Sequence, residues 1–227
     1  MGGHGLLSFQ RGCTNMMIIM IESKYDRHHI TVNDAPEEFA MKVSREQMAE
    51  NRRRILDVAS SLFRDRGFDA VSVAEVMKAA GLTHGGFYGH FSSKDDLVAQ
   101  TLAHVLAADV GGKTDIRAYL EAYLSPRHRD NPAAGCPTAG LAAAIRHQTP
   151  AARAAMTEGL RSQIARIEAA LPAADPADRR CTAIGSWSAM VGAVILARAI
   201  DDPALSDEIL EQTRAWIEAG IADGSAL

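Results

Sequence analysis

Hydrophobic side chains recur along most of this 227-residue chain at the spacing of an α-helix. The clearest run lies between residues 55 and 63, where apolar residues fall at positions i, i+3, i+4, i+7 and i+8, the stripe of an amphipathic helix. Its members are Ile55, Val58, Ala59, Leu62 and Phe63. Ser44 and Gln47 have the spacing of a capping box, and Gly67 follows the last apolar residue. The pattern therefore predicts a first helix that begins at Ser44 and ends at Gly67.

Two shorter helices are predicted next. Ser72 and Glu75 repeat the capping-box spacing, and Gly81 is placed to end the helix that they begin. Thr83 can cap the following helix, which runs to about His90. That helix contains three glycines, Gly85, Gly86 and Gly89, and its inward residues are Leu82, Phe87 and Phe91. Because a glycine inside a helix costs roughly 0.8–1 kcal/mol relative to alanine, three of them indicate that the backbone here approaches something closely.

The rest of the chain is also predicted to be helical. Ser93 and Asp96 begin a fourth helix that ends before Gly111 and Gly112. Further helices are expected over 114–124, 136–148, 150–171, 176–200 and from Ser206 onward, with a loop over 125–135. Two of them begin with an N-cap followed by proline, at Thr149–Pro150 and Asp175–Pro176. No segment of four to eight residues alternates convincingly, so the predicted fold class is all-α.

Residues 1–43 lack a helical period, and we expect them to form a poorly ordered N-terminal extension with a plausible natural start at Met41. The apolar run Met16–Ile21 is too short for a membrane span or a signal sequence. Three cysteines, Cys13, Cys136 and Cys181, lie far apart without a CxxC motif, so neither a disulfide framework nor a zinc site is indicated. These features predict a cytoplasmic protein with no membrane partner, no metal and no cofactor.

The net charge of the chain is −4 and its pI is about 6.1, so the whole molecule is not a polycation. Residues 44–97 are neutral, because eight basic residues balance eight acidic ones, and the remainder carries the negative charge. Whole-chain charge says little about one face of a protein. A nucleic-acid partner therefore stays open.

Two short helices joined at Gly81, after a longer helix, form a helix-turn-helix unit, which places its second short helix in the DNA major groove. Thr83 and His84 are placed to touch base edges, and Gly85 lets the backbone approach the DNA. Tyr88, His90 and Lys94 follow at spacings suited to phosphates. Metal binding by His84 and His90 is disfavoured, because a spacing of six positions puts the two side chains on different faces of a helix.

Residues 55–98, ILDVASSLFRDRGFDAVSVAEVMKAAGLTHGGFYGHFSSKDDLV, resemble the DNA-binding domain of the TetR family of bacterial transcriptional regulators. The marks are A..LF...GF, SV.E...AAG and T.G.FY.HF.SK..L, in the right order. The resemblance implies DNA contacts at Ser72, Thr83, Tyr88, His90 and Lys94. Val73 and Ala74 depart from the polar residues of some members, so we expect His84 and Thr83 to carry much of the direct readout and DNA shape the rest.

The resemblance also implies a larger helical C-terminal domain that binds a small ligand and dimerises through its last two helices. The predicted domains are the extension 1–43, a DNA-binding domain 44–92, and an effector-binding and dimerisation domain 93–227. Small residues among large ones in the helix 176–200 suit a two-fold interface or an ordinary core. The candidate effector pocket is lined by Tyr119, Tyr123, Leu141, Met156, Trp187 and Met190, for which core packing is the alternative.

Cys136 adds a possible chemical sensor. It precedes Pro137, which is expected in the first turn of a helix, where unpaired N–H groups favour a thiolate. Arg127, His128 and Arg129 would assist if their loop folds back. The GCPTAGL stretch resembles a glycine-cysteine element of some TetR-like regulators, certain of which respond to electrophiles or oxidants. A small buried hydrophobic residue is the alternative interpretation of Cys136.

The sequence predicts a homodimeric, sequence-specific DNA-binding regulator, a repressor that leaves its operator on binding a small effector or on modification of a thiol. The fourth helix, which starts at Lys94 and runs into the sensing domain, is the candidate mechanical link. The alternative is a helical small-molecule-binding module without operator function. An enzyme is disfavoured, because the sequence offers no convincing nucleophile–base set and no GxSxG elbow.

Overall fold

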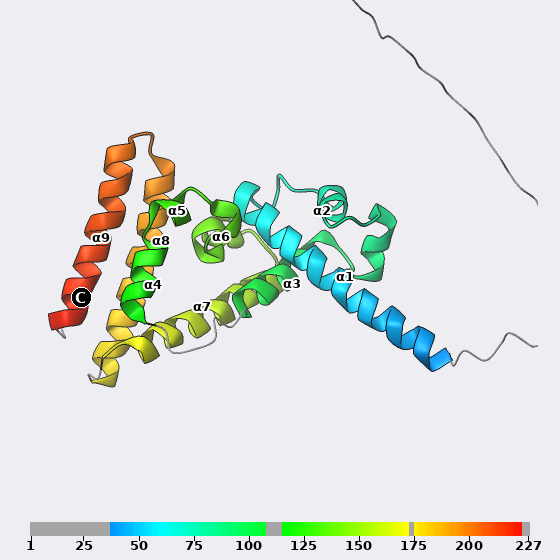
Figure 1. Cartoon of the computed structure of the whole chain (residues 1–227), viewed down its shortest axis with the longest axis horizontal. Coiled ribbons are helices and arrows are strands. Elements are labelled where there is room, and N and C mark those ends of the chain that lie inside the picture. The colour runs from blue at the N-terminus through cyan, green and yellow to red at the C-terminus, as the bar shows by residue number, and fades with distance from the viewer. Residues whose placement is uncertain (1–36, 108–114, 173–174, 224–227) are drawn as a thin grey trace, which may run out of the picture.

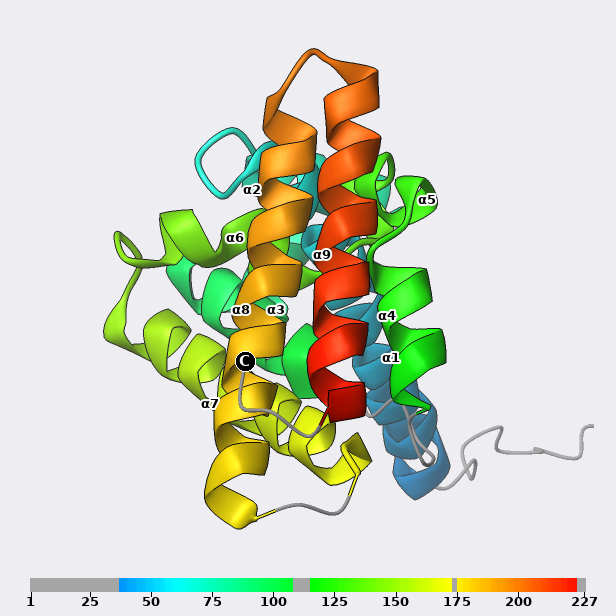
Figure 2. The same cartoon turned by 90° about the vertical axis from the view of Figure 1, so that its left-hand side faces the viewer.

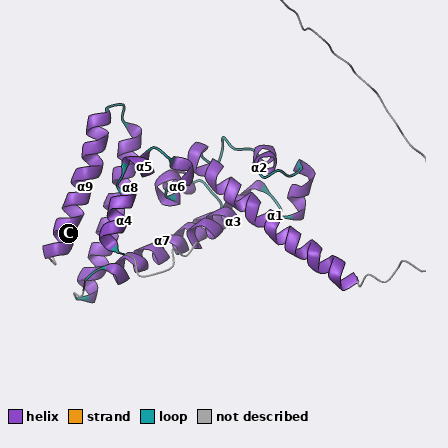
Figure 3. Cartoon of the chain, in the orientation of Figure 1, coloured by secondary structure: helices purple, strands orange, loops and turns teal. Residues whose placement is uncertain are grey.

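The computed structural model describes residues 37–107, 115–172 and 175–223, and these form helices joined by turns and short loops, with no strand among them (Figures 1 and 3). The predicted all-α fold is confirmed. The α-helices are α1 (Glu37–Arg66), α2 (Val73–Ala79), α3 (Lys94–Ala107), α4 (Ile116–Tyr123), α5 (Pro126–Arg129), α6 (Pro137–Ile145), α7 (Pro150–Ala170), α8 (Pro176–Ala199) and α9 (Pro203–Asp223). Two 3₁₀ helices are η1 (His84–Gly89) and η2 (Pro132–Ala134).

The first helix is longer than predicted. α1 begins at Glu37, so Ser44 lies inside it and does not cap it. The residues before Ser44, EEFAMKV, include several strong helix formers, which explains why the helix extends backward past the capping-box spacing. Its end is as predicted, because Gly67 has φ 80° and its N–H donates to the Phe63 carbonyl at 2.8 Å. Residues 1–36, with Cys13 and the Met16–Ile21 run, lie outside the described part of the chain.

The predicted capping box of α2 is confirmed. The Ser72 hydroxyl accepts from the Glu75 N–H at 3.2 Å, and the Ser72 N–H donates to the Glu75 carboxylate at 2.8 Å. Gly81, at φ 70°, ends this helix. The helix predicted to follow is not an α-helix but the 3₁₀ helix η1, and the Thr83 hydroxyl makes no capping hydrogen bond. Three glycines weaken the α-helical preference, and i to i+3 bonds form instead.

Two hydrophobic clusters organise the molecule. One gathers Phe63, Phe87 and Leu97 from the helices around α1, and the other gathers Leu120, Met190 and Ile217 around α8 and α9. α7 lies between these two parts (Figure 1). The first cluster also includes Leu141 and Met156, from beyond residue 93, so the boundary between residues 92 and 93 stays a prediction.

Two expectations for the C-terminal half are wrong. The loop predicted over 125–135 contains α5 and η2, because Ser125 and Asn131 cap short helices that each begin with proline. The last helix begins at Pro203, since the Asp202 carboxylate accepts from the two following N–H groups at 3.0 and 3.2 Å. The proline starts at Pro150 and Pro176 are confirmed. Gly111, Gly112 and Thr114 lie outside the described residues.

α8 is the most apolar of the long helices. By length and composition it could cross a membrane, with a mean hydropathy of 1.4 over 18 residues, and 44% of that window is buried inside the structure. The core helix of a globular protein has the same properties. Figure 2 shows α8 and α9 side by side on one face of the molecule. Part of the apolar surface of α8 is therefore exposed to solvent.

Candidate nucleic-acid interface and effector cavity

The segment η1 has one buried face and one exposed face. Phe87 is 1% exposed and stacks on Phe91 at a ring distance of 5.6 Å, which holds the segment on the core. Tyr88, the next residue, is 70% exposed. Ser72, Thr83, His84 and Gly85 are also exposed, whereas His90 and Lys94 are half-buried. The structure thus brings the predicted DNA-contact residues to the surface of one helix-turn-helix unit, and their contacts with DNA stay predictions.

The glycines of η1 are not required by the fold itself. An added Cβ at Gly85 would meet nothing within 4 Å, and at Gly86 and Gly89 the nearest atoms would lie 3.6 and 3.9 Å away. The positive-φ glycines among the described residues are Gly67 and Gly81, so these three adopt backbone angles that other residues also adopt. Bare backbone at Gly85 therefore leaves room for something outside the protein.

Arg52 of α1 fixes the end of η1. Its guanidinium donates to the His90 carbonyl and to the Gln100 side chain, and it lies 4.5 Å from the centre of the Phe91 ring. Burial and the neighbouring Arg52 lower the pKa of His90, so its ring is neutral near pH 7. His90 can then meet a phosphate as a hydrogen-bond donor rather than as a cation. Sequence patterns did not indicate this role of Arg52, which depends on contacts 38 and 48 residues away.

α3 begins at Lys94, close to η1. Its first turn also holds Asp95 and Asp96, and the Asp96 carboxylate accepts from the Ser92 N–H at 2.9 Å. The Ser93 hydroxyl in turn accepts from the Asp96 N–H at 3.0 Å, as the sequence predicted. Lys94 therefore lies in the first turn of a helix that the Ser93 side chain caps.

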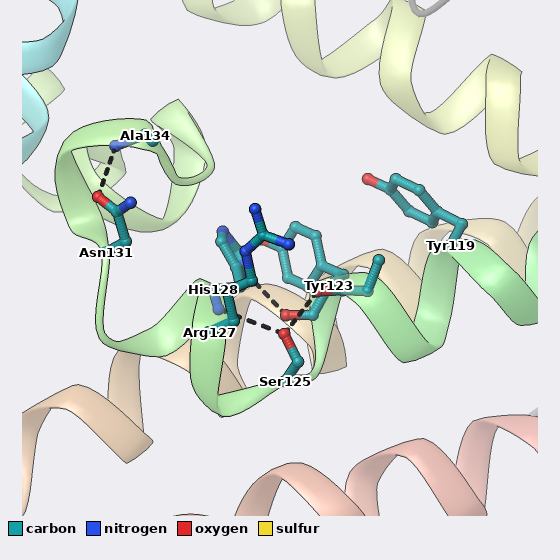
Figure 4. Close-up of a pocket in the computed structure, with 8 residues that line it drawn as sticks. Tyr119, Tyr123, Ser125, Arg127, His128, Asn131 and Ala134 are labelled. Carbon is teal, nitrogen blue, oxygen red and sulfur yellow. Dashed lines mark hydrogen bonds between the residues drawn. The ribbon is translucent and has the colours of Figure 1, made fainter.

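A second site lies in the C-terminal half, where α4, α5 and η2 enclose a cavity of about 440 Å³ (Figure 4). A neighbouring cavity of about 360 Å³ shares with it Tyr119, Tyr123 and His128, and it is also lined by Cys136. We call this second space the cysteine cavity. The Tyr123 ring is central to it, at 4.5 Å from the His128 ring and 5.4 Å from the Trp187 ring. Both volumes suit a small ligand.

Four of the predicted effector residues line the cysteine cavity, namely Tyr119, Tyr123, Cys136 and Trp187. Leu141 and Met156 are instead buried in the cluster around α1, and Met190 is buried in the cluster around α8 and α9. None of these three is among the residues that line the cysteine cavity. The sequence did not indicate two cationic lining residues, Arg64 and Arg166, which come from α1 and α7.

His128 connects the cavity wall to the start of α6. Its Nδ1 lies 2.7 Å from the Tyr123 carbonyl oxygen, and its Nε2 lies 2.9 Å from the Cys136 backbone nitrogen. A carbonyl accepts and an N–H donates, so these two contacts require the neutral tautomer with its proton on Nδ1. Burial lowers the pKa of His128, and nearby Arg198 lowers it further, which favours the same neutral form.

Cys136 is the N-cap residue of α6 and is half-buried. Its side chain makes no capping hydrogen bond. The residue before it, Gly135, is closely surrounded, since an added Cβ would lie 2.8 Å from the Arg198 guanidinium and 3.0 Å from His128 Nε2. Of the three basic residues expected to fold back, His128 lines the cysteine cavity and Arg127 lines its neighbour, but Arg129 turns away to Asp207 at 2.5 Å.

The exposed face of α8 and α9 carries several large apolar side chains, among them Ile195, Leu196 and Trp216. Leu196 is 56% exposed and Trp216 is 51% exposed. Both line a groove between the two helices. An added Cβ at Gly192 in this groove would meet nothing within 4 Å. The face is therefore apolar and open to close approach.

Within the described ranges, no group of three or more His, Cys, Asp or Glu side chains is arranged to hold a metal ion. Cys181 is exposed on α8, and neither it nor Cys136 forms a disulfide among the described residues.

A family model described as "Bacterial regulatory proteins, tetR family" matches residues 55–101. The AcrR transcriptional regulator of Shigella flexneri is 42% identical over 57 residues, which cover 25% of this chain and 26% of that protein. The KstR2 transcriptional repressor of Rhodococcus jostii is 38% identical over 82 residues, which cover 33% of this chain and 40% of that protein. The chain thus matches between a quarter and two-fifths of the length of these curated relatives.

The fold of about three-quarters of the chain is similar to that of solved regulators. The reduced form of NemR from E. coli superposes with a TM-score of 0.62 at 24% identity, covering 75% of this chain and 96% of that one. A TetR-family regulator from Agrobacterium tumefaciens gives a TM-score of 0.58 at 21% identity, covering 76% and 98%. At such identities the similarity establishes the fold alone.

Proposed function

The chain belongs to the TetR family of helix-turn-helix transcriptional regulators, and we propose that it acts as a homodimeric repressor released from its operator by a small effector or by modification of Cys136. The observation that carries the proposal is the exposed, glycine-bearing face of η1 within the matched domain. The family is one of regulatory proteins, so no catalytic role is proposed. Work on chromosomal DNA implies a cytoplasmic location.

In this proposal η1 enters the major groove of operator DNA. Thr83 and His84, at its exposed N-terminal end, contact base edges, and Gly85 lets the backbone approach. Tyr88 and Lys94 bind phosphates, as does His90 through a hydrogen bond, and Ser72 lies at the start of α2 facing the same DNA. The few side chains on η1 leave part of the sequence preference to DNA shape.

Dimerisation through α8 and α9 is supported by their open apolar face, on which the Leu196 and Trp216 side chains are exposed to solvent. A second copy related by a two-fold axis would place two η1 segments on one side of the DNA. Half-sites one helical turn apart require a separation of about 34–36 Å. Such a dimer would cover the apolar surface and would favour a palindromic operator.

The cysteine cavity is the proposed effector site, and Cys136 within it is the proposed sensor thiol. Alkylation by iodoacetamide offers a direct probe of the thiol: the sulfur forms a bond to carbon, iodide leaves, and the thiol proton passes to the buffer. The bulkier adduct would fill the space beside Tyr123 and His128.

A gel-shift experiment with the upstream region of the protein's own gene tests the DNA function. We expect retention of this duplex over a random competitor at low ionic strength, and loss of binding as salt increases. Lys94→Ala should weaken binding to all sequences and reduce the salt slope by about one, whereas His84→Ala should change the preference among operators. No preference for any duplex would favour a helical ligand-binding module without operator function.

The thiol role is tested in a chain that carries Cys13→Ser and Cys181→Ser, so that Cys136 is its single cysteine. Treatment with iodoacetamide should release the operator from this protein. The matched control adds Cys136→Ser and should keep the operator bound under the same treatment. Equal release from both proteins would contradict the sensor role of Cys136.

A further inference from the structure

Among the described residues, the wall of the cysteine cavity carries positive charge without a matching carboxylate. Arg64 and Arg166 both line it, and none of its lining residues in the described part of the chain is an aspartate or glutamate. Among the described residues, Arg64 donates to the Gly135 carbonyl at 3.2 Å and Arg166 to the Gln163 side chain, and neither forms an ion pair. Burial lowers the pKa of Arg64. A partly buried guanidinium without a counter-ion is unfavourable unless an anion joins it.

The same wall carries hydrogen-bond donors that have no acceptor. The Tyr123 hydroxyl, the Trp187 indole N–H and the Arg64 Nε are buried and without a hydrogen-bond partner in the described part of the chain. Tyr123 is 7% exposed and Trp187 is 6% exposed, so solvent does not readily satisfy these groups. All three belong to lining residues of the cysteine cavity. A ligand rich in acceptor oxygens would satisfy those donors that a small side-chain movement opens to the cavity.

Part of the remaining wall is apolar or aromatic. Val105 and Leu106 come from the end of α3, and the Tyr119 and Trp187 rings come from α4 and α8. A volume of about 360 Å³ is enough for one or two rings with a polar group attached. The cavity therefore combines a flat apolar part with a cationic, donor-rich part.

We propose that the cysteine cavity binds a small aromatic carboxylate, with Arg64 and Arg166 as its charge partners and the Tyr123 hydroxyl and Trp187 N–H as donors to its oxygens. This proposal names the chemical class of the effector. Its consequence for operator release rests on the proposed repressor function. Two guanidiniums suit a carboxylate because each presents N–H donors in a planar fork.

Arg64 also provides a structural link through which binding of such a ligand affects the DNA-binding unit. It lies near the C-terminal end of α1, whose other residues pack against α2, η1 and α3, and it crosses to the Gly135 carbonyl beside Cys136. A carboxylate that draws the guanidinium into the cavity competes with this hydrogen bond. The link therefore runs through α1, in addition to the link through α3 that the sequence indicated.

The test compares 2-naphthoate with the neutral 2-naphthamide by isothermal titration calorimetry on the full-length protein. We expect naphthoate to bind at least about tenfold more tightly, because only the anion gains from the two guanidiniums. Arg166→Gln should remove most of this preference. The matched control is Arg161→Gln on the same helix, whose guanidinium is exposed and pairs with Glu158 at 3.5 Å. This control should keep the preference.

Arg64→Gln should also reduce the preference, and circular dichroism melting will show whether it folds; if it does not, Arg166→Gln decides. Equal binding of acid and amide, a preference that survives Arg166→Gln, or no binding of naphthoate would each overturn the proposal. A gel shift run in parallel distinguishes failure of the proposed ligand class from failure of the proposed repressor function. Specific operator binding without naphthoate binding refutes only this ligand class, whereas naphthoate binding without any operator binding refutes the repressor function.

Discussion

Gly85 occupies a position where a side chain would meet no other part of the protein. Selection for internal packing therefore does not explain the glycine, and alanine would be favoured by helix propensity alone. The proposed explanation is external: the backbone of η1 lies against DNA. A methyl group at this position would separate the two surfaces, although the folded protein would accommodate it without strain.

We predict that Gly85→Ala leaves thermal stability unchanged or slightly raised and weakens operator binding by about tenfold or more. Differential scanning calorimetry and a gel shift at fixed salt measure the two effects. Gly81→Ala is the matched control, because its φ of 70° makes a Cβ unfavourable by about 1–2 kcal/mol. It should lower the melting temperature. A loss of stability in Gly85→Ala would show that the glycine serves the fold.

His128 makes stability depend on pH. Its pKa in the folded protein lies below the ordinary value of 6.5, so the unfolded chain takes up a proton first as the pH falls. Stability is therefore complete above about pH 6.5 and decreases below it. We predict that urea denaturation shows this decrease, and that His128→Gln reduces it. His90, whose pKa is also lowered, should retain part of the effect. An unchanged pH dependence in His128→Gln would contradict this role of His128.

At the scale of helices, α3 and α7 approach each other closely. An added Cβ at Gly159 would lie 2.6 Å from the Leu106 Cβ, which is too close for any real contact between these atoms. Leu106 and Gly159 both line the cysteine cavity, so this crossing sets the shape of one of its walls. Since α3 begins next to η1, the crossing also joins the cysteine cavity to the helix-turn-helix unit.

We predict that Gly159→Ala destabilises the protein by about 1–3 kcal/mol, because α3 and α7 must separate to admit the methyl group. Urea denaturation measures this difference. Gly185→Ala on α8, where a Cβ would meet nothing within 4 Å, should be neutral or stabilising by up to about 1 kcal/mol. Unchanged stability of Gly159→Ala would mean that the helices separate easily and that the crossing is not a rigid link.

Local signals allowed several helix ends to be predicted from the sequence. The capping box at Ser72 and the N-cap prolines at Pro150 and Pro176 act within a few residues, so tertiary structure did not override them. The same spacing at Ser44 did not predict the start of α1, because strong helix formers precede Ser44 and extend the helix. η1 became a 3₁₀ helix because its glycines weaken an α-helix, although its position and inward phenylalanines were predicted.

The cavity was less accessible to sequence reasoning. Its tyrosines, Trp187 and Cys136 could be selected because such residues are chemically distinctive. Arg64 could not, because its contact with Gly135 spans 71 residues and depends on how α1 crosses α6. Leu141 and Met156 show the opposite limit: helical periodicity predicts a buried face but does not say which of two clusters it joins.

At the scale of the whole molecule, the two ends carry surfaces of different chemical character. The η1 face is polar and suits DNA, whereas the α8–α9 face exposes Leu196 and Trp216 beside a groove of about 440 Å³. Contiguous exposed apolar surface on a regulator of this fold is explained by a partner. A second copy of the same chain is the simplest partner, because a two-fold interface uses one surface twice.

We predict that Leu196→Glu converts the dimer to a monomer, since two buried, unpaired carboxylates would face each other across the two-fold axis. Leu196 is 56% exposed in the single chain, so the monomer should keep its helical content and fold. Light scattering after gel filtration measures the mass, and a gel shift measures the operator affinity. That affinity should fall by about a hundredfold or more when each half-site is bound independently. Ala165→Glu, at an exposed site on α7, is the control and should remain dimeric. A Leu196→Glu protein that stays dimeric with full operator affinity would place the interface on a different face of the molecule.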